Sequence, residues 1–337
     1  GSVGASWRRW RRLMGAITLW AGWTLSGAGS AFDVSGVTSL SGAAVSVGAG
    51  HALNWTSTMA LASVSITASE GASVSFSAAE SLNDVSLNAN DGSEIAFPVA
   101  TSYLDGGHGE VLEASGVGSR IELSALATFD GGYHTSTQLK ALEGGWLGVS
   151  GALSSSTSWT LSGAGSAFDV SGVTEIAAAT IEVSDGLVLT LGSATNLTDV
   201  NLYARGGSEI LFPVATSYVD SGNGNVLEAS GSGSRIDLSA LATFDGGDHT
   251  STRLKALEGG WLGLSGAFSS STSWTLSGAG SAFDVSGVTA IARATIHVSD
   301  SVILTFGSTT ELIDVNLDVR SGGVLSLTSG SVLGGRY

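Results

Sequence analysis

The sequence contains no cysteine and only two prolines in 337 residues. The absence of cysteine excludes disulfide bonds and thiolate metal sites, although it does not decide the compartment. Charged residues are also scarce, at 12% of the chain, where roughly 25% is usual. Hydrophobic residues make up 43% and alternate with Ser, Thr and Gly. The chain therefore has ample material for a core and little for long helices, and disorder is not expected.

Basic residues are few, with 13 Lys and Arg against 29 Asp and Glu, and the formal net charge is −16. Four of the 13 are Arg8, Arg9, Arg11 and Arg12. The rest of the chain is thus strongly acidic and would be repelled by nucleic acid and by anionic membranes. Beyond the N-terminal region no stretch is long and apolar enough to span a bilayer. We predict no nucleic-acid partner, no membrane span and no cofactor.

The N-terminal segment, residues 1–17, differs from everything that follows. Its arginines precede an apolar run, Leu13 to Trp23, which imitates a signal peptide. That run continues without a break into WTLSGAGSAFDVSGV, which recurs later, so cleavage after Ala31 would cut a repeat. Residues 1–17 are a signal, the end of a fragment or a frameshifted segment, and the sequence leaves these alternatives open. We expect residues 18–337 to form one continuous solenoid.

Internal repeats organise the rest of the chain. WTLSGAGSAFDVSGV begins at Trp23, Trp159 and Trp274, and the last two copies are 115 residues apart (274 − 159). This super-repeat gives blocks at about 64–178 and 179–293 and a partial block at 294–337. Each block divides into smaller units of 20–28 residues, in which short alternating strands are separated by Gly, Asp or Ser turns.

Such units predict an all-β fold, a single-stranded parallel β-helix (β-solenoid) of about 14 coils nested in the 115-residue super-repeat. Leucine-rich repeats lack support because the LxxLxLxxN pattern is absent, and units this short are unfavourable for an array of β-sandwiches. One interior ladder should contain the apolar pairs Ile95 and Phe97, Ile121 and Leu123, Leu147 and Val149, Phe168 and Val170, and Leu189 and Leu191.

The segment GGWLGVSGALSSSTSWTLSGAGSAFDVSG resembles the Gly/Ser/Ala-rich repeats of bacterial surface β-helix proteins, namely autotransporter passengers and filamentous-haemagglutinin-like adhesins. The resemblance is one of composition and periodicity. It implies an extracellular or cell-surface location and a role in adhesion, surface layers or fibres. Surface glycans or other surface proteins are the expected partners. Head-to-tail association of copies into a filament is also expected, because no polar cap for the strand edges is evident at either end of the sequence.

Comparison of the two blocks tests individual residues. His108 becomes Asn223 and Tyr133 becomes Asp248, so neither residue type can be essential in both blocks. Asp130 and His134, by contrast, are repeated as Asp245 and His249. An Asp and a His four residues apart on a Gly-rich loop could bind a metal ion, but Asp-Gly-Gly is ordinary turn chemistry and a third ligand is not evident, so we favour the turn.

β-Helices also include polysaccharide lyases and hydrolases, which need clustered carboxylates. The candidates are duplicated, namely Glu94, Arg120, Glu122 and Glu143 with Glu209, Arg235, Asp237 and Glu258. A catalytic interpretation would need two sites, so we predict that the protein is not an enzyme and expect Arg120 to pair with Glu94 on the outer face. A carbohydrate-binding or polysaccharide-degrading β-helix is the alternative.

Trp146 and Trp261 each come directly before a leucine that we expect to be buried. Because neighbouring residues of a strand face opposite sides of the sheet, each block should have an outward-facing indole. Either a loop covers each indole, or the exposed ring contacts carbohydrate or a neighbouring solenoid.

Overall fold

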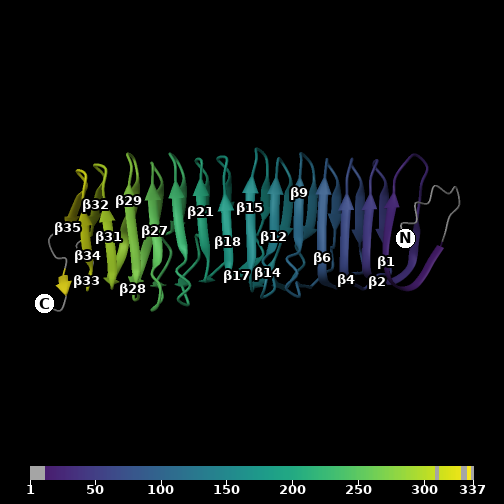
Figure 1. The fold of residues 1–337 in the computed structure, drawn as a ribbon, viewed down its shortest axis with the longest axis horizontal. Coiled ribbons are helices and arrows are strands. Elements are labelled where there is room, and N and C mark those ends of the chain that lie inside the picture. Colours follow the sequence, from purple (N-terminus) through teal and green to yellow (C-terminus); the bar gives the residue numbers. More distant parts are fainter. Residues whose placement is uncertain (1–11, 308–310, 328–331, 335–337) are drawn as a thin grey trace. The chain divides into compact units, whose positions relative to one another are not determined.

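The chain folds into a parallel β-solenoid of about 14 turns, as the repeats predicted. The computed structural model describes residues 12–307, 311–327 and 332–334, and these contain strands and turns but no helix (Figure 1). Two compact units are distinguished, residues 1–173 and residues 174–337. No described segment is a helix long and apolar enough to cross a membrane.

In the first unit each turn contributes strands to three faces, and each strand pairs in parallel with its counterpart in the next turn. One face contains β3 (Ala52–Trp55), β5 (Ser73–Phe76), β7 (Glu94–Ala96), β10 (Arg120–Leu123), β13 (Trp146–Val149) and β16 (Ala167–Asp169). The other two contain β8 (Ser102–Leu104), β11 (Thr128–Asp130) and β14 (Gly151–Ser154), and β9 (Val111–Ser115), β12 (Thr137–Leu142) and β15 (Thr157–Ser162). In the earlier turns these two faces are formed by four longer strands: β1 (Arg12–Leu25), β2 (Asp33–Val47), β4 (Ala60–Ala68) and β6 (Ser81–Asn90).

The second unit repeats this arrangement. The counterparts of the first face are β19 (Val188–Thr190), β22 (Glu209–Leu211), β25 (Arg235–Leu238), β28 (Trp261–Phe268), β30 (Ala282–Ala292), β32 (Ile303–Phe306) and β35 (Val324–Leu327). The second face contains β17 (Val173–Ala177), β20 (Asn196–Thr198), β23 (Ser217–Val219), β26 (Thr243–Asp245), β33 (Glu311–Ile313) and β36 (Val332–Gly334). The third contains β18 (Ala179–Val183), β21 (Asn201–Arg205), β24 (Val226–Ser230), β27 (Thr252–Leu257), β29 (Thr272–Ser277), β31 (Ala294–Val298) and β34 (Asn316–Val319).

Nine of the ten side chains predicted for the interior ladder are buried, at most 3% exposed. Ile95, Ile121 and Leu147 are register partners, 26 residues apart in both steps (121 − 95 and 147 − 121). The tenth, Phe168, is in register with Leu147 but is only half-buried. Its ring packs edge-on against Trp159, with the ring centroids 5.9 Å apart. The unit length varies between turns because extra residues are accommodated at corners, which leaves the ladder register unchanged.

Corners determine where a turn changes face. Asp84 has φ of 51° inside β6, so residues before it pair with β8 and residues after it pair with β9. Its copy Asp199 has φ of 54°. Asp tolerates this left-handed conformation better than most residues because its short polar side chain forms local hydrogen bonds. The carboxylate at such a corner lies on the outer surface, next to the following turn.

The predicted boundary at residue 17 lies inside β1, which pairs in parallel with β2. Residues 1–11, including Arg8, Arg9 and Arg11, are outside the described residues.

Candidate functional site

The loop between β8 and β9 is organised by one buried carboxylate. Asp105 is 1% exposed. It accepts hydrogen bonds from the N–H groups of Gly107 (2.8 Å), His108 (2.8 Å), Gly109 (3.2 Å) and Glu110 (3.0 Å) and from the hydroxyl of Thr137 (2.8 Å). Burial alone would raise the pKa of Asp105, but these hydrogen bonds, led by that from the Glu110 N–H, outweigh burial and lower the pKa. Asp105 is therefore ionised in the folded protein, and its carboxylate fixes the backbone of the loop.

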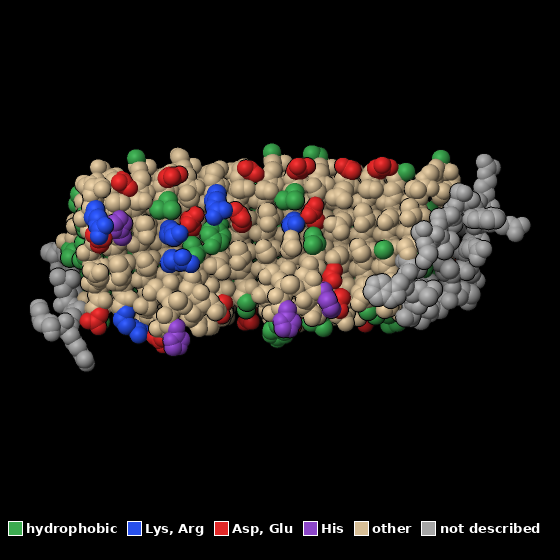
Figure 2. Space-filling model, in the orientation of Figure 1, with side chains coloured by type: hydrophobic (Ala, Val, Ile, Leu, Met, Phe, Trp, Pro, Cys, Tyr) green, Lys and Arg blue, Asp and Glu red, His purple; other side chains and the backbone are tan. Residues whose placement is uncertain are grey.

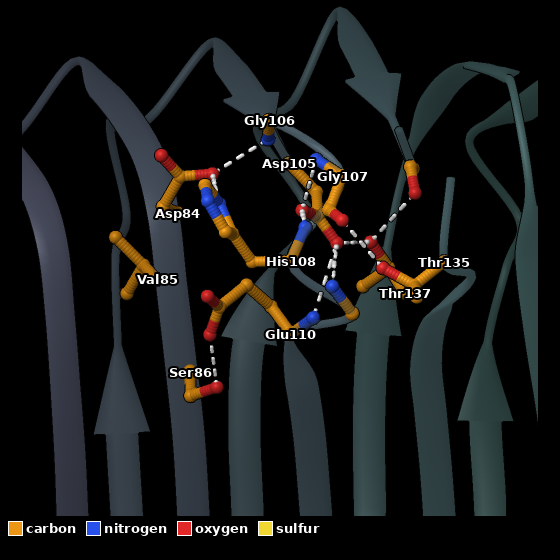
Figure 3. A network of polar contacts seen from close by, with 12 residues as sticks. Asp84, Val85, Ser86, Asp105, Gly106, Gly107, His108, Glu110, Thr135 and Thr137 are labelled. Carbon is orange, nitrogen blue, oxygen red and sulfur yellow. Dashed lines mark hydrogen bonds and ion pairs between the residues drawn. The ribbon is translucent and has the colours of Figure 1, made fainter. Parts of the chain in front are cut away.

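This loop directs two side chains toward the corner residue of the preceding turn (Figure 3). His108 Nδ1 lies 3.2 Å from Asp84 Oδ1, and the Ser86 hydroxyl donates a hydrogen bond to Glu110. The Gly106 N–H also donates to Asp84. One ligand atom from each of Asp84, His108 and Glu110 can be chosen so that all three lie within 4.8 Å of one another. We call these three residues the corner cluster.

His108 is exposed, whereas Asp84 and Glu110 are half-buried. The hydrogen bond to Asp84, followed by the negative charge of the same carboxylate, raises the pKa of the His108 imidazole. The electrostatic environment of the cluster thus favours a positive charge.

The corner cluster lines a groove of about 660 Å³ on the outer surface of the first unit. The groove also passes over four small residues that are in register on successive strands: Gly22, Ala44, Ser65 and Ser86. Small side chains at these outward positions leave the surface hollow. The cluster is therefore open to a small ligand from the groove side.

The second block keeps the framework of this site and changes its functional groups. Asp220 accepts hydrogen bonds from the N–H groups of Gly222 (2.9 Å), Asn223 (2.7 Å) and Asn225 (2.9 Å) and from the hydroxyl of Thr252 (2.7 Å), as Asp105 does in the first block. Asp199 occupies the corner and accepts the Ser221 N–H at 2.7 Å. The two remaining cluster positions are Asn223 and Asn225 in place of His108 and Glu110. The imidazole and the second carboxylate are not needed for the loop to fold.

The comparison of blocks in the sequence set His108 aside because its copy is Asn223, and so the corner cluster was missed. A usable signal was present, since Asp84 and His108 are separated by 24 residues, about one turn of the solenoid. Such a spacing places two side chains on adjacent turns.

Asp130 and Asp245 lie in tight turns. Asp130 accepts the Gly132 N–H at 3.1 Å, and Asp245 accepts the Gly247 N–H at 3.1 Å. His134 and His249 are exposed. Among the described residues neither Asp–His pair belongs to a group of three potential ligands; the corner cluster is the group that the geometry brings together.

Trp146 and Trp261 are each covered by an arginine from the preceding turn. The Arg120 guanidinium carbon lies 3.3 Å from the centroid of the Trp146 ring, and Arg235 lies 3.7 Å from that of Trp261. Both indoles are half-buried. Trp146 also lies across Gly148, where a Cβ would collide with the ring. The sequence predicted a covering loop or an exposed ring that contacts carbohydrate or a neighbouring solenoid; the structure shows an arginine over one face of each indole.

The same arginines pair with three of the carboxylates considered as catalytic candidates, namely Glu94, Glu122 and Asp237. Arg120 is in register with Glu94, as predicted, at 3.9 Å between Nε and Oε1, and it forms a closer ion pair with Glu122. In the second block Arg235 pairs with Asp237 at 2.6 Å. In these ion pairs the guanidinium and carboxylate charges compensate each other on the outer surface of the sheet.

Comparison with protein-family models, curated proteins and solved structures finds no match to this chain.

Proposed function

We propose that this protein is a structural or adhesive scaffold that acts outside the cell. The supporting observation is the residue-by-residue register between turns, in which Ile95, Ile121 and Leu147 stack in the first unit, and Ile210, Ile236 and Leu262 stack in the second. A stack of this kind repeats each outward position about every 4.8 Å. It provides a regular surface for multivalent contacts.

The outward-facing charges support a scaffold more than an active site. Glu228 lies between two basic residues from neighbouring turns, at 3.1 Å from Lys255 and 3.6 Å from Arg205. In the first unit Lys140 pairs with Glu113 at 3.5 Å. Figure 2 shows one face of the molecule, on which charged side chains form small groups among uncharged atoms. Such pairs contribute a few tenths of a kcal/mol to about 1 kcal/mol each and link adjacent turns.

The extracellular location is supported by the resemblance of the repeats to bacterial surface β-helix proteins. It is also supported by the composition, in which charged residues are few and mostly acidic. Self-association through strand edges is the second part of the proposal. In the described part of the chain β1 pairs only with β2, and β35 pairs only with β32. A strand edge that no other strand covers is a template for a further strand, and in this proposal copies of the chain join at such edges.

Sedimentation velocity over a range of protein concentrations, combined with negative-stain microscopy, tests self-association. We expect the mean sedimentation coefficient to rise with concentration and elongated assemblies to appear. Monodisperse monomers at the highest concentration would reject assembly through the edges. A glycan array and a reducing-sugar release assay test the carbohydrate alternative, and sugar release would replace the scaffold proposal with an enzymatic one.

A further inference from the structure

The corner cluster combines one imidazole nitrogen with two carboxylates, a ligand set that suits a divalent transition metal. Calcium and magnesium prefer sites formed entirely by oxygen atoms, whereas imidazole favours zinc and its neighbours in the first transition series. The three residues come from two adjacent turns: Asp84 from the corner of β6, and His108 and Glu110 from the loop before β9. The ligand set is therefore assembled by the solenoid fold.

The distance between His108 and Asp84 is close to that between two ligands of a zinc site. With Zn–N and Zn–O bonds of about 2.0–2.2 Å, tetrahedral ligand atoms lie roughly 3.3–3.5 Å apart. His108 Nδ1 and Asp84 Oδ1 are 3.2 Å apart, and all three ligand atoms lie within 4.8 Å. Rotation of the exposed His108 side chain or of Glu110 would bring the third atom into range without movement of the backbone.

The backbone around the cluster is already fixed. Asp105 holds both loop residues through their N–H groups, and the Gly106 N–H orients Asp84. Little conformational freedom would be lost when a cation binds, which favours affinity. Metal binding would replace the contact between His108 and Asp84 and the hydrogen bond from Ser86 to Glu110.

The groove leaves space beside the cluster for a further ligand. Three protein ligands leave the fourth position of a tetrahedral zinc ion open. The cluster lines a hollow of about 660 Å³ that passes over Ala44, Ser65 and Ser86, so the open position faces space for a water molecule or a small ligand.

We propose that Asp84, His108 and Glu110 form a binding site for a divalent transition-metal cation of the Zn²⁺ type. The site belongs to the first block alone, because the second block has Asn223 and Asn225 at the loop positions. It is separate from the scaffold role and does not depend on it.

The test is isothermal titration of the full chain with ZnCl₂, repeated with CoCl₂ while the absorption of Co²⁺ in the visible range is recorded. The variant H108N/E110N gives the first block the residues that the second block carries naturally at these positions, and it should therefore fold; far-UV circular dichroism checks this. We expect one Zn²⁺ per chain for the wild type, at least about 100-fold weaker binding for the variant, and a Co²⁺ spectrum that the variant lacks.

Equal affinity of the wild type and the folded variant would overturn the proposal, because any bound metal would then lie elsewhere. Displacement of Zn²⁺ by an equimolar amount of CaCl₂ would overturn the transition-metal assignment. A second variant, D130N/H134N, removes the Asp–His pair predicted from the sequence and should retain the full affinity. A loss in D130N/H134N equal to that in H108N/E110N would contradict the assignment of the ligands.

Discussion

Thr137 donates a 2.8 Å hydrogen bond to Asp105 across 32 residues of sequence, and Thr252 repeats this bond to Asp220 at 2.7 Å. The carboxylate is the centre of its loop in both blocks. Replacement of Asp105 by Asn removes the charge and turns one acceptor oxygen into a donor that faces other donors. We expect Asp105→Asn to reduce local stability by about 1.5–3 kcal/mol, measured by amide hydrogen exchange at Gly107, His108 and Glu110.

Asp130→Asn is the matched control, since Asp130 accepts one backbone hydrogen bond from its own turn, at 3.1 Å. It should change exchange within the turn at Gly132 and leave the amides of the Asp105 loop protected. Unchanged exchange in Asp105→Asn would show that the loop does not depend on the carboxylate.

The lowered pKa of Asp105 predicts how the loop responds to acid. A carboxyl whose pKa is lower in the folded state stabilises that state above its unfolded pKa, about 3.9, and the stabilisation is lost as the pH falls through the lower folded value. In the amide chemical shifts of Gly107 and Glu110, the acid transition that reports Asp105 should therefore have its midpoint below the ordinary Asp pKa, separate from the step that His108 gives at higher pH. A transition centred at the ordinary Asp pKa would contradict this prediction.

The fold could be predicted because its determinants are local and repeated. Ile95 and Phe97 lie two positions apart and are both buried, turns that contain Gly, Asp or Ser follow many of the strands, and similar units return every 20–28 residues. The corner cluster depends instead on the length of one loop, which determines how far His108 reaches back toward Asp84. Block comparison discards residues that occur once, although a site added to one copy of a repeat is expected to occur once. The cover on Trp146 was missed for a related reason, because Arg120 was assigned to Glu94 alone.

The stack of Arg120 on Trp146 predicts a change in solvent access to the indole. Both Arg120→Ala and Arg120→Lys should increase acrylamide quenching of tryptophan fluorescence, because lysine keeps the charge but lacks the planar guanidinium. The loss in stability should be about 0.5–1 kcal/mol, as expected for an exposed cation–π pair. Quenching that is unchanged in both variants would mean that the arginine does not cover the ring.

Arg293→Ala is the control for general effects of charge removal, because its guanidinium pairs with the Asp248 carboxylate at 3.1 Å. Arg235→Ala should repeat the result of Arg120→Ala in the second block, at Trp261.

Two buried tryptophans in the first unit differ in one hydrogen bond. Trp159 Nε1 donates to the Thr157 hydroxyl at 2.9 Å, whereas Trp55 Nε1 is buried without a hydrogen-bond partner among the described residues. Trp55 stacks on Phe76 at 5.2 Å. Trp55→Phe removes an unsatisfied donor and keeps an aromatic ring, while Trp159→Phe breaks a bond. We expect Trp55→Phe to be the milder change by about 1–2 kcal/mol, measured by thermal and urea unfolding.

Trp274→Phe provides the matched control for Trp159→Phe, since Trp274 Nε1 donates to Thr272 at 2.8 Å. These two variants should be similarly destabilised. A larger loss for Trp55→Phe than for either would show that ring volume, and not the hydrogen bond, determines the cost.

The metal proposal can also be tested by gain of function, because the second block retains Asp199 at the corner and Asp220 in the loop. The variant N223H/N225E supplies the imidazole and the carboxylate that the first block has. A chain with this change should bind two Zn²⁺ ions, and a chain that also carries H108N/E110N should bind one. Asn225 is 4% exposed, so circular dichroism and sedimentation must first show that the variant is folded. A folded N223H/N225E chain that still binds a single ion would mean that the three ligands are not sufficient and that a further feature of the first block, such as its groove, is required.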